Sequence, residues 1–402
     1  MAAGNRARNV SSYASGGGVN KAKATGLPRA KHSTRLSFFI GGFGIACWAP
    51  MVPFAQERLQ ADSSQLGSIL LCLGLGALVG MPVAGGVVAR KGPRISVISG
   101  AAGLCIALPL LATMTNPWLL AMSLLLLGAS VGAVDVAANI HGTEVQNAAS
   151  TPLMSGFHGL YSIGGLAGAS GMTLAIAAGL HVASAAMLAS GVIILAVLMA
   201  APGFMKVRAQ SGHSAFVLPR GVVIVMGLLL FTIFLAEGAV LDWGAILLTQ
   251  VKHIEVSRSG IGYTVFAFSL TISRFFGDWL VSRAGARIVL FSGIFLTGIG
   301  LAVAVIATPI LIVLGGIGVA GLAAGNVVPI ILTAAGRQHV MSASAAIAAT
   351  STMGYLGILM GPALIGYISH FTGLQICLIL VSMFTLSTAM AVPAIMIGNK
   401  NS

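Results

Sequence analysis

The feature that most constrains this chain is a series of apolar runs, each about 20 residues long, separated by short polar or glycine-rich breaks. A helical run of this length matches the hydrocarbon core of a bilayer. The sequence is 57% hydrophobic and only 7% charged over 402 residues, which excludes an ordinary soluble domain. The alternating ten-residue pattern of a membrane β-barrel is absent. We therefore expect an all-α membrane protein with about twelve transmembrane helices.

The basic residues are distributed unevenly along the chain. The net charge of +13 would suit a nucleic-acid-binding protein, but 17 of the 21 Lys and Arg residues fall on one side of the membrane. They lie in the first 35 residues and in loops such as RKGPR at 90–94. The positive-inside rule then predicts that both termini are cytoplasmic, in a multi-pass protein of the bacterial inner membrane. We expect the chain to be embedded in a lipid bilayer and to bind no nucleic acid.

A direct repeat relates the two halves of the chain at a single ungapped offset of 193 residues. It predicts two six-helix, pseudo-symmetric halves related by an axis along the membrane normal, with a cavity at their interface. The expected organisation is a disordered basic cytoplasmic tail at 1–34, an N-terminal half at 35–201, a cytoplasmic central loop at 202–219, a C-terminal half at 220–398 and a short tail at 399–402. The matched positions include Arg90 and Arg283, Gly92 and Gly285, Arg94 and Arg287, Gly100 and Gly293, Gly128 and Gly321, and Gly164 and Gly357.

Acidic residues inside the predicted spans are the first candidates for function. Asp135 shares a helix face with Gly128, Gly132 and Asn139. A charge at membrane depth costs about 2.5–3.5 kcal/mol, so this face should point into the bundle. Asp135 is our candidate proton carrier, and the alternative is a structural acid that is hydrogen-bonded to Asn139. Glu237 is the second proton-coupling candidate, for which a structural role stays open.

Further polar residues in the spans are candidates for a gate and a substrate site. Arg274 and Asp278 are four residues apart and predict an ion pair near the inner gate. Alternatively, Arg274 binds an anionic substrate or the carboxylate of the other half. For Asp242 and Trp243 we expect a cap and an anchor at the outer membrane interface. The gate candidates are Arg90, Arg94, Arg274, Asp278 and Arg283.

Polar residues three apart on one span, His158 and Tyr161, would face a cavity together. The histidine could relay a proton and the tyrosine could hydrogen-bond a hydroxylated substrate, whereas a packed histidine is the rival interpretation. Asn326 and Tyr355 are candidate polar residues of the cavity wall. The complete set of substrate-binding candidates is Asn139, His158, Tyr161, Asn326 and Tyr355.

No pattern in the sequence points to a cofactor, a metal or catalysis. The four cysteines are scattered singly, without the spacing of a metal site or a disulfide framework. A glycine-rich phosphate loop with Lys and Ser/Thr is absent, and so is a nucleophile constellation for hydrolysis. We expect a monomer that is not an enzyme and that uses an external gradient.

Several motifs give the chain a resemblance to transporters of the major facilitator superfamily over essentially all of residues 35–398. The loops GGVVARKGPR and DWLVSRAGAR resemble its signature between spans 2 and 3 and the echo between spans 8 and 9. The acid that usually precedes the Arg at 90 and 283 is replaced here by Ala89 and Ser282. VDVAAN at 134–139 resembles a motif of fucose/proton symporters. WAPMVP, SGFHGLYSIGGLAG and FLAEGAVLDW look like the bacterial group that includes YbjJ and MocC.

Together these features predict a secondary transporter that works by alternating access. The resemblance to sugar symporters favours proton-coupled symport of a small solute such as a sugar, a polyol or a sugar acid. A proton-coupled antiporter for efflux of drugs or metabolites is the alternative transport function. A membrane sensor that kept the transporter fold without transporting is a third hypothesis, which the altered positions Ala89 and Ser282 keep open.

Overall fold

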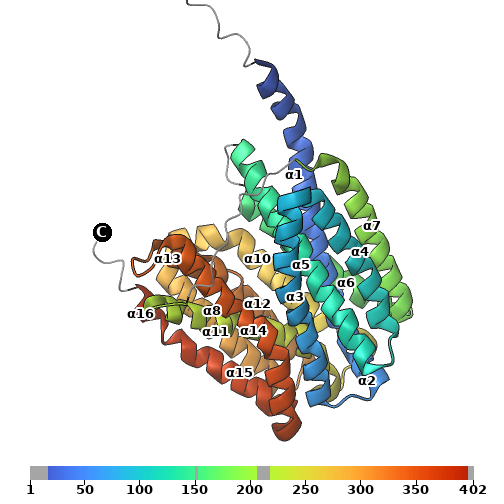
Figure 1. Cartoon of the computed structure of the whole chain (residues 1–402). Coiled ribbons are helices and arrows are strands. Elements are labelled where there is room, and N and C mark those ends of the chain that lie inside the picture. The colour runs from blue at the N-terminus through green and yellow to red at the C-terminus, as the bar shows by residue number, and fades with distance from the viewer. Residues whose placement is uncertain (1–16, 150–152, 206–217, 397–402) are drawn as a thin grey trace, which may run out of the picture.

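The computed structural model describes residues 17–149, 153–205 and 218–396. In its N-terminal half, five long helices follow a span that is interrupted near its end (Figure 1). The interrupted span comprises α1 (Gly17–Ala46), η1 (Ala49–Met51) and α2 (Val52–Leu59). The others are α3 (Ser63–Lys91), α4 (Pro93–Thr113), α5 (Pro117–Ala149), α6 (Met154–Ala177) and α7 (Val182–Ala200), with the short η2 (Ala201–Gly203) at the end.

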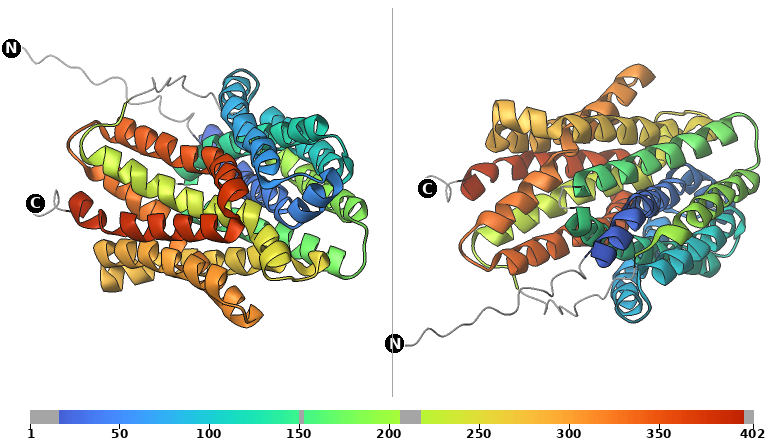
Figure 2. Two further views of the ribbon diagram at one scale, coloured as in Figure 1. Left: turned by 90° about the horizontal axis from the view of Figure 1, so that it is seen from below. Right: turned by 90° about the horizontal axis from the view of Figure 1, so that it is seen from above.

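The C-terminal half repeats this order with a second interrupted span. That span comprises α8 (Val222–Gly238), the π-helical η3 (Ala239–Trp243), α9 (Gly244–Ile246) and the π-helical η4 (Leu247–Val251). The remaining elements are η5 (Val256–Arg258), α10 (Ile261–Ala284), α11 (Ala286–Ile306), α12 (Ile310–Ala324), α13 (Val327–Arg337), α14 (Ala343–Thr372), α15 (Leu374–Ala389) and α16 (Val392–Met396). Seen from two opposite sides, the two halves form groups that lie side by side (Figure 2).

Ten helical segments in the described ranges are long and apolar enough to cross a membrane. The charged α10 and the shorter, 16-residue α15 bring the arrangement to the twelve spans that the sequence predicts. The all-α fold class is therefore confirmed.

The 193-residue repeat reappears in the packing of the helices. The pairs α1–α6, α3–α5, α4–α5 and α4–α7 have counterparts in α8–α14, α10–α12, α11–α12 and α11–α15. The turns after α3 and α10 also match, because Gly92 and Gly285 have φ angles of 84° and 82°. Glycine is required at both turns, since other residues rarely adopt a positive φ. The two halves contact each other where α3 packs on α14 and where α6 packs on α10. The repeat relates these two contacts, because α10 is the counterpart of α3 and α14 is the counterpart of α6.

The two ends of the bundle differ in how closely the halves approach. We call the end with the loops 90–94 and 283–287 the basic face, and the end with the turns at Asp62 and Gly373 the sealed face. At the sealed face, Gln250 Nε2 donates to Gln56 Oε1 across the halves at 2.9 Å. Toward the basic face, a Cβ on Gly85 or Gly86 of α3 would meet no atom within 4 Å. The halves therefore part toward the basic face (Figure 1).

The predicted tail at 1–34 is partly helical instead of disordered. α1 begins at Gly17, and Ala30, Ser33 and Thr34 are buried. Ser33 Oγ donates to the Ala200 carbonyl at 2.6 Å, and Thr34 Oγ1 lies 2.8 Å from Nδ1 of the buried His141. The alanines and lysines before the span are good helix formers, so the helix continues outward from it. The prediction for 1–16 and for 399–402 lies outside the described residues, as does most of the central loop.

Candidate substrate and proton site

The first predicted acid, Asp135, lies on α5 and is half-buried. Asn139 Nδ2 donates to Asp135 Oδ1 at 3.1 Å and to the Asp135 carbonyl at 2.9 Å. The amide one turn later thus holds one oxygen of the carboxyl group in place. The second oxygen remains available to a proton or to a ligand, which makes a proton-binding role geometrically feasible.

A tyrosine from each half lies near this carboxyl group. Tyr161 of α6 and Tyr355 of α14 lie within range of the electrostatic influence of Asp135. Tyr161 packs its ring against Gly41 of α1, where a Cβ would approach it to 3.3 Å. Tyr355 is 45% exposed, and its ring centroid lies 5.7 Å from that of Phe234 on α8. The structure thus brings Tyr161 and Tyr355, two predicted substrate-binding residues, near the predicted proton carrier Asp135, and their roles stay predictions.

Arg274 connects this group to the second acid. Its Nη1 donates to Ser162 Oγ on α6 at 2.8 Å, which joins α10 of one half to α6 of the other. Its charge also acts on the half-buried Glu237 of α8 and on Tyr161. Tyr263 of α10 lies near both Glu237 and Arg274. We call Asp135, Tyr161, Glu237, Tyr263, Arg274 and Tyr355 the central cluster.

The remaining substrate candidates differ in their placement. His158 is exposed and packs edge-on against Phe38, with ring centroids 4.8 Å apart, and it lies near Arg274. Asn326 is 7% exposed, and its Nδ2 donates to the Ser273 carbonyl at 2.9 Å and to Ser273 Oγ at 2.8 Å. This position differs from the predicted place in the cavity wall. Asn326 instead joins α10 to the break between α12 and α13.

The predicted gate residues lie mostly on the basic face. Arg90, Arg94 and Arg283 are exposed, and the Arg283 guanidinium stacks 5.7 Å from the ring centre of Trp279. Arg274 lies deeper, in the central cluster. The side chain of Asp278 is outside the described part of the structure, so the expected pair with Arg274 stays a prediction.

Asp242 and Trp243 do not cap the outer interface as expected. They are 1% and 0% exposed and belong to the π-helical η3. The prediction was wrong because η3 turns both side chains into the bundle, and FLAEGAVLDW carries no specific signal for a π-helical turn. Sequence reasoning also missed His141, which is buried and accepts a hydrogen bond from the Met205 backbone N–H at 3.0 Å. A polar residue in an apolar run was the available signal.

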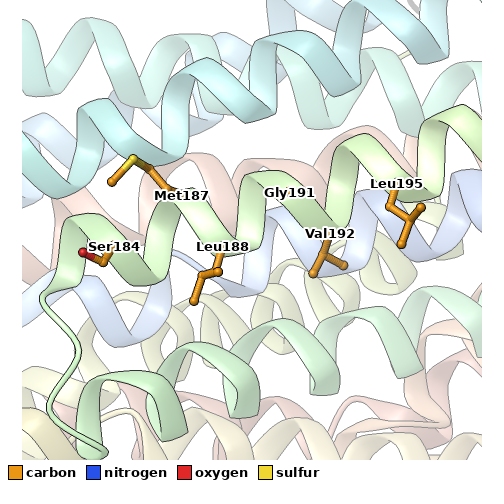
Figure 3. A pocket seen from close by; sticks show the side chains of 6 residues that line it. All are labelled: Ser184, Met187, Leu188, Gly191, Val192 and Leu195. Carbon is orange, nitrogen blue, oxygen red and sulfur yellow. The ribbon is translucent and has the colours of Figure 1, made fainter.

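Other concave or ligand-like features lie away from the central cluster. The outer face of α7 carries an apolar hollow that faces away from the bundle, as Figure 3 shows. This hollow is lined by Ser184, Met187, Leu188, Gly191, Val192 and Leu195. Among the described residues, no group of three or more His, Cys, Asp or Glu side chains could hold a metal ion.

Comparison with known proteins decides the family. The chain is 41% identical over 365 residues to an MFS-type transporter of Yersinia pestis, which covers 90% of this chain and 95% of that relative. The chain belongs to the major facilitator superfamily (MFS). It is also 30% identical to the transporter y4wD of Sinorhizobium fredii, over 89% of this chain and 96% of y4wD. The membrane protein MosC of Rhizobium meliloti is 29% identical, over 84% of this chain and 83% of MosC.

Solved structures agree on the MFS fold, although no protein-family model matches the chain. The nucleoside transporter NupG superimposes with a TM-score of 0.73 over 92% of this chain and 99% of NupG, at 15% sequence identity. At that identity the similarity concerns the fold alone. The expectation of a multi-pass transporter and not an enzyme is confirmed by these MFS relatives.

Proposed function

We propose that this MFS transporter moves a small polyhydroxylated solute into the cell together with a proton, by symport. The observation that carries the proposal is the composition of the central cluster, which has one half-buried carboxyl group in each half. Three tyrosines and an arginine lie among these two acids. The cluster thus combines groups for a proton with groups for a hydroxylated solute.

The chemistry of each group supports its role in this proposal. A carboxyl group in a low-dielectric cavity binds a proton in one state and releases it when hydration changes in the other. Phenol groups both donate and accept hydrogen bonds, as sugar and polyol hydroxyls require. Arg274 would favour an acidic group on the solute, since a guanidinium matches a carboxylate in shape and charge.

The proposed orientation places the basic face in the cytoplasm of a bacterial cell. It is supported by the positively charged loops at that face, including Arg90, Arg94, Arg283 and Arg287. In this orientation the described state is open to the cytoplasm and closed to the outside. Rocking of one half against the other would open the sealed face and expose the same central cluster to the other side.

The test is proton entry into proteoliposomes that contain the purified protein and an internal pH indicator. Sugars, polyols and sugar acids are added in turn to wild type, Asp135→Asn and Glu237→Gln. We expect at least one of these solutes to drive proton entry in wild type. The same solute should drive no proton entry in Asp135→Asn. Glu144→Gln is the matched control, because Glu144 is an exposed acid on the same helix. Proton entry that survives both cluster variants would refute coupling through these carboxyl groups.

Solute exchange separates coupling from binding. A transporter that has lost its proton site should still exchange labelled for unlabelled solute, because both half-reactions then occur without a net proton. We therefore expect Asp135→Asn to retain exchange and to lose accumulation against a gradient. Loss of both activities would place Asp135 in solute binding instead.

A further inference from the structure

A second polar group lies between the central cluster and the sealed face, and the proposed transport step does not use it. Asp242 is 1% exposed, and Trp48 and Trp243 are 0% exposed. Within the described residues, Asp242 Oδ1, Trp48 Nε1 and Trp243 Nε1 are all buried without a hydrogen-bond partner. Most buried polar groups in proteins are paired, so these unpaired groups, of which Trp48 and Asp242 lie side by side, require a physical reason.

The backbone brings these residues together from the two halves. Trp48 directly precedes η1, where span 1 is interrupted, and Asp242 lies in η3, where span 7 is interrupted. The repeat offset of 193 residues places Trp48 opposite Leu241, so the two interruptions are related by the pseudo-symmetry. Trp48 lies beside the Asp242 carboxyl group, although the contact falls short of hydrogen-bond geometry. A π-helical turn within a helix often marks a functional position.

The surroundings of Asp242 do not offer a partner for a negative charge. Glu237 on the same span is itself an acid. Of α10, which packs on η3, Tyr263 lies near Asp242, whereas Arg274 lies in the central cluster and hydrogen-bonds to α6. The described part of α14, which also packs on η3, has no acidic or basic residue before His370 at its far end. An unpaired carboxylate in such a place would carry a large desolvation penalty. A proton removes that penalty, because the protonated carboxyl group is neutral.

We propose that Asp242 binds a proton while the sealed face is closed and releases it to water when that face opens, so that the Trp48–Asp242 contact is a proton-operated latch. The proton enters and leaves at the sealed face, and the carboxylic acid becomes a carboxylate that water hydrates. It is therefore distinct from the proton that Asp135 would carry across the membrane. The inference rests on the proposed alternating access, but it does not require symport or any particular solute.

The four tryptophans make the latch observable. Trp48 and Trp243 are buried at it, whereas Trp118 and Trp279 are 77% and 58% exposed on the outside of the bundle. A reporter protein with Trp118→Phe and Trp279→Phe keeps only the two latch residues. Its fluorescence is recorded in detergent without solute, from about pH 5 to about pH 8, where buried carboxyl groups and histidine titrate. We expect emission to move to longer wavelength as pH rises, because opening hydrates both indoles.

Two substitutions in the reporter separate Asp242 from its rival. In Asp242→Asn, which mimics the protonated acid, emission should stay at short wavelength at every pH. His370 Nδ1 lies 3.9 Å from Asp62 Oδ1 across the sealed face and is the rival ionisable contact there. In His370→Gln and in Glu57→Gln, a control at an exposed acid of the same face, the pH response should persist. A response that survives Asp242→Asn, or that is absent from the reporter itself, overturns the proposal.

A third variant keeps the proposal testable if Asp242→Asn does not fold. Trp48→Phe removes the indole N–H beside the carboxyl group and leaves Trp243 as the reporter. The pH at which Trp243 emission changes should then differ from that in the unaltered reporter. An unchanged midpoint would overturn the latch. Because no flux is measured, failure of the latch and failure of proton symport give different results.

Discussion

A pair of glycines related by the repeat allows a quantitative test of the two-fold packing. Gly100 of α4 faces α5, where a Cβ would lie 2.8 Å from the Ser130 carbonyl oxygen and 2.7 Å from Val134 Cγ2. Gly293 of α11 faces α12 and α13, where a Cβ would lie 3.0 Å from the Ala323 carbonyl oxygen and 2.8 Å from Val327 Cγ2. Every residue in the second contact is 193 positions after its counterpart.

Substitution of either glycine by alanine forces the paired helices apart. A carbon and a carbonyl oxygen ordinarily meet no closer than about 3.3 Å, so a backbone shift of several tenths of an ångström is needed at each site. Overpacking of this kind typically costs about 1–3 kcal/mol. Alanine in a helix interior gains about 1 kcal/mol over glycine, which offsets part of the loss. Gly191 of α7 isolates that gain, because a Cβ there would meet no atom within 4 Å.

The assay is equilibrium unfolding in mixed micelles by titration with a denaturing detergent. We expect Gly191→Ala to be more stable than wild type by about 1 kcal/mol. Gly100→Ala and Gly293→Ala should each be less stable than Gly191→Ala by about 1–3 kcal/mol. If both variants match Gly191→Ala, the helices do not approach as closely as described. If only one is destabilised, the packing is not two-fold.

Two further predictions concern the contacts between the halves. Ser162→Ala removes the acceptor of the hydrogen bond that Arg274 donates. A hydrogen bond to a charged group contributes about 1.5–3 kcal/mol. The equilibrium constant for separation of α6 from α10 should therefore rise about 10- to 150-fold. The labelling rate of a cysteine at Gly159, which faces Phe275 of α10, should rise accordingly, and an unchanged rate contradicts this role. Asp62 begins α3 by accepting a bond from the Gln65 backbone N–H at 2.8 Å, and this bond holds the pKa of its carboxyl group below the usual 3.8. Asp62→Ala should therefore lower the unfolding temperature, and the full decrease is expected above about pH 4. The difference from wild type should shrink as pH falls through the lowered pKa. A difference that is constant with pH argues against the charged cap.

The apolar runs and the repeat predicted the fold well because both follow from the bilayer. A span must be helical and about 20 residues long, and direct packing of helices in lipid selects glycine at matched positions such as Gly128 and Gly321. The chemistry was harder to place. Asp135 and Asn139 could be assigned to one helix face because helix spacing fixes their relative direction, and they are hydrogen-bonded to each other. Asp242 could not, because the π-helical turn that redirects it depends on contacts between distant spans.

The repeat also separates the residues that hold the fold from those that could drive transport. Several positions that face a neighbouring backbone are glycine in both halves, as at Gly100 and Gly293. The three buried or half-buried acids have no such counterparts: 193 positions away from Asp135, Glu237 and Asp242 stand Val328, Gly44 and Ala49. In the proposed cycle, symmetric packing would let the two halves rock about one axis, and the asymmetric acids would make the two end states differ in their affinity for a proton. A gradient can bias an alternating-access cycle only if such a difference exists, because a ligand with equal affinity for both states shifts neither.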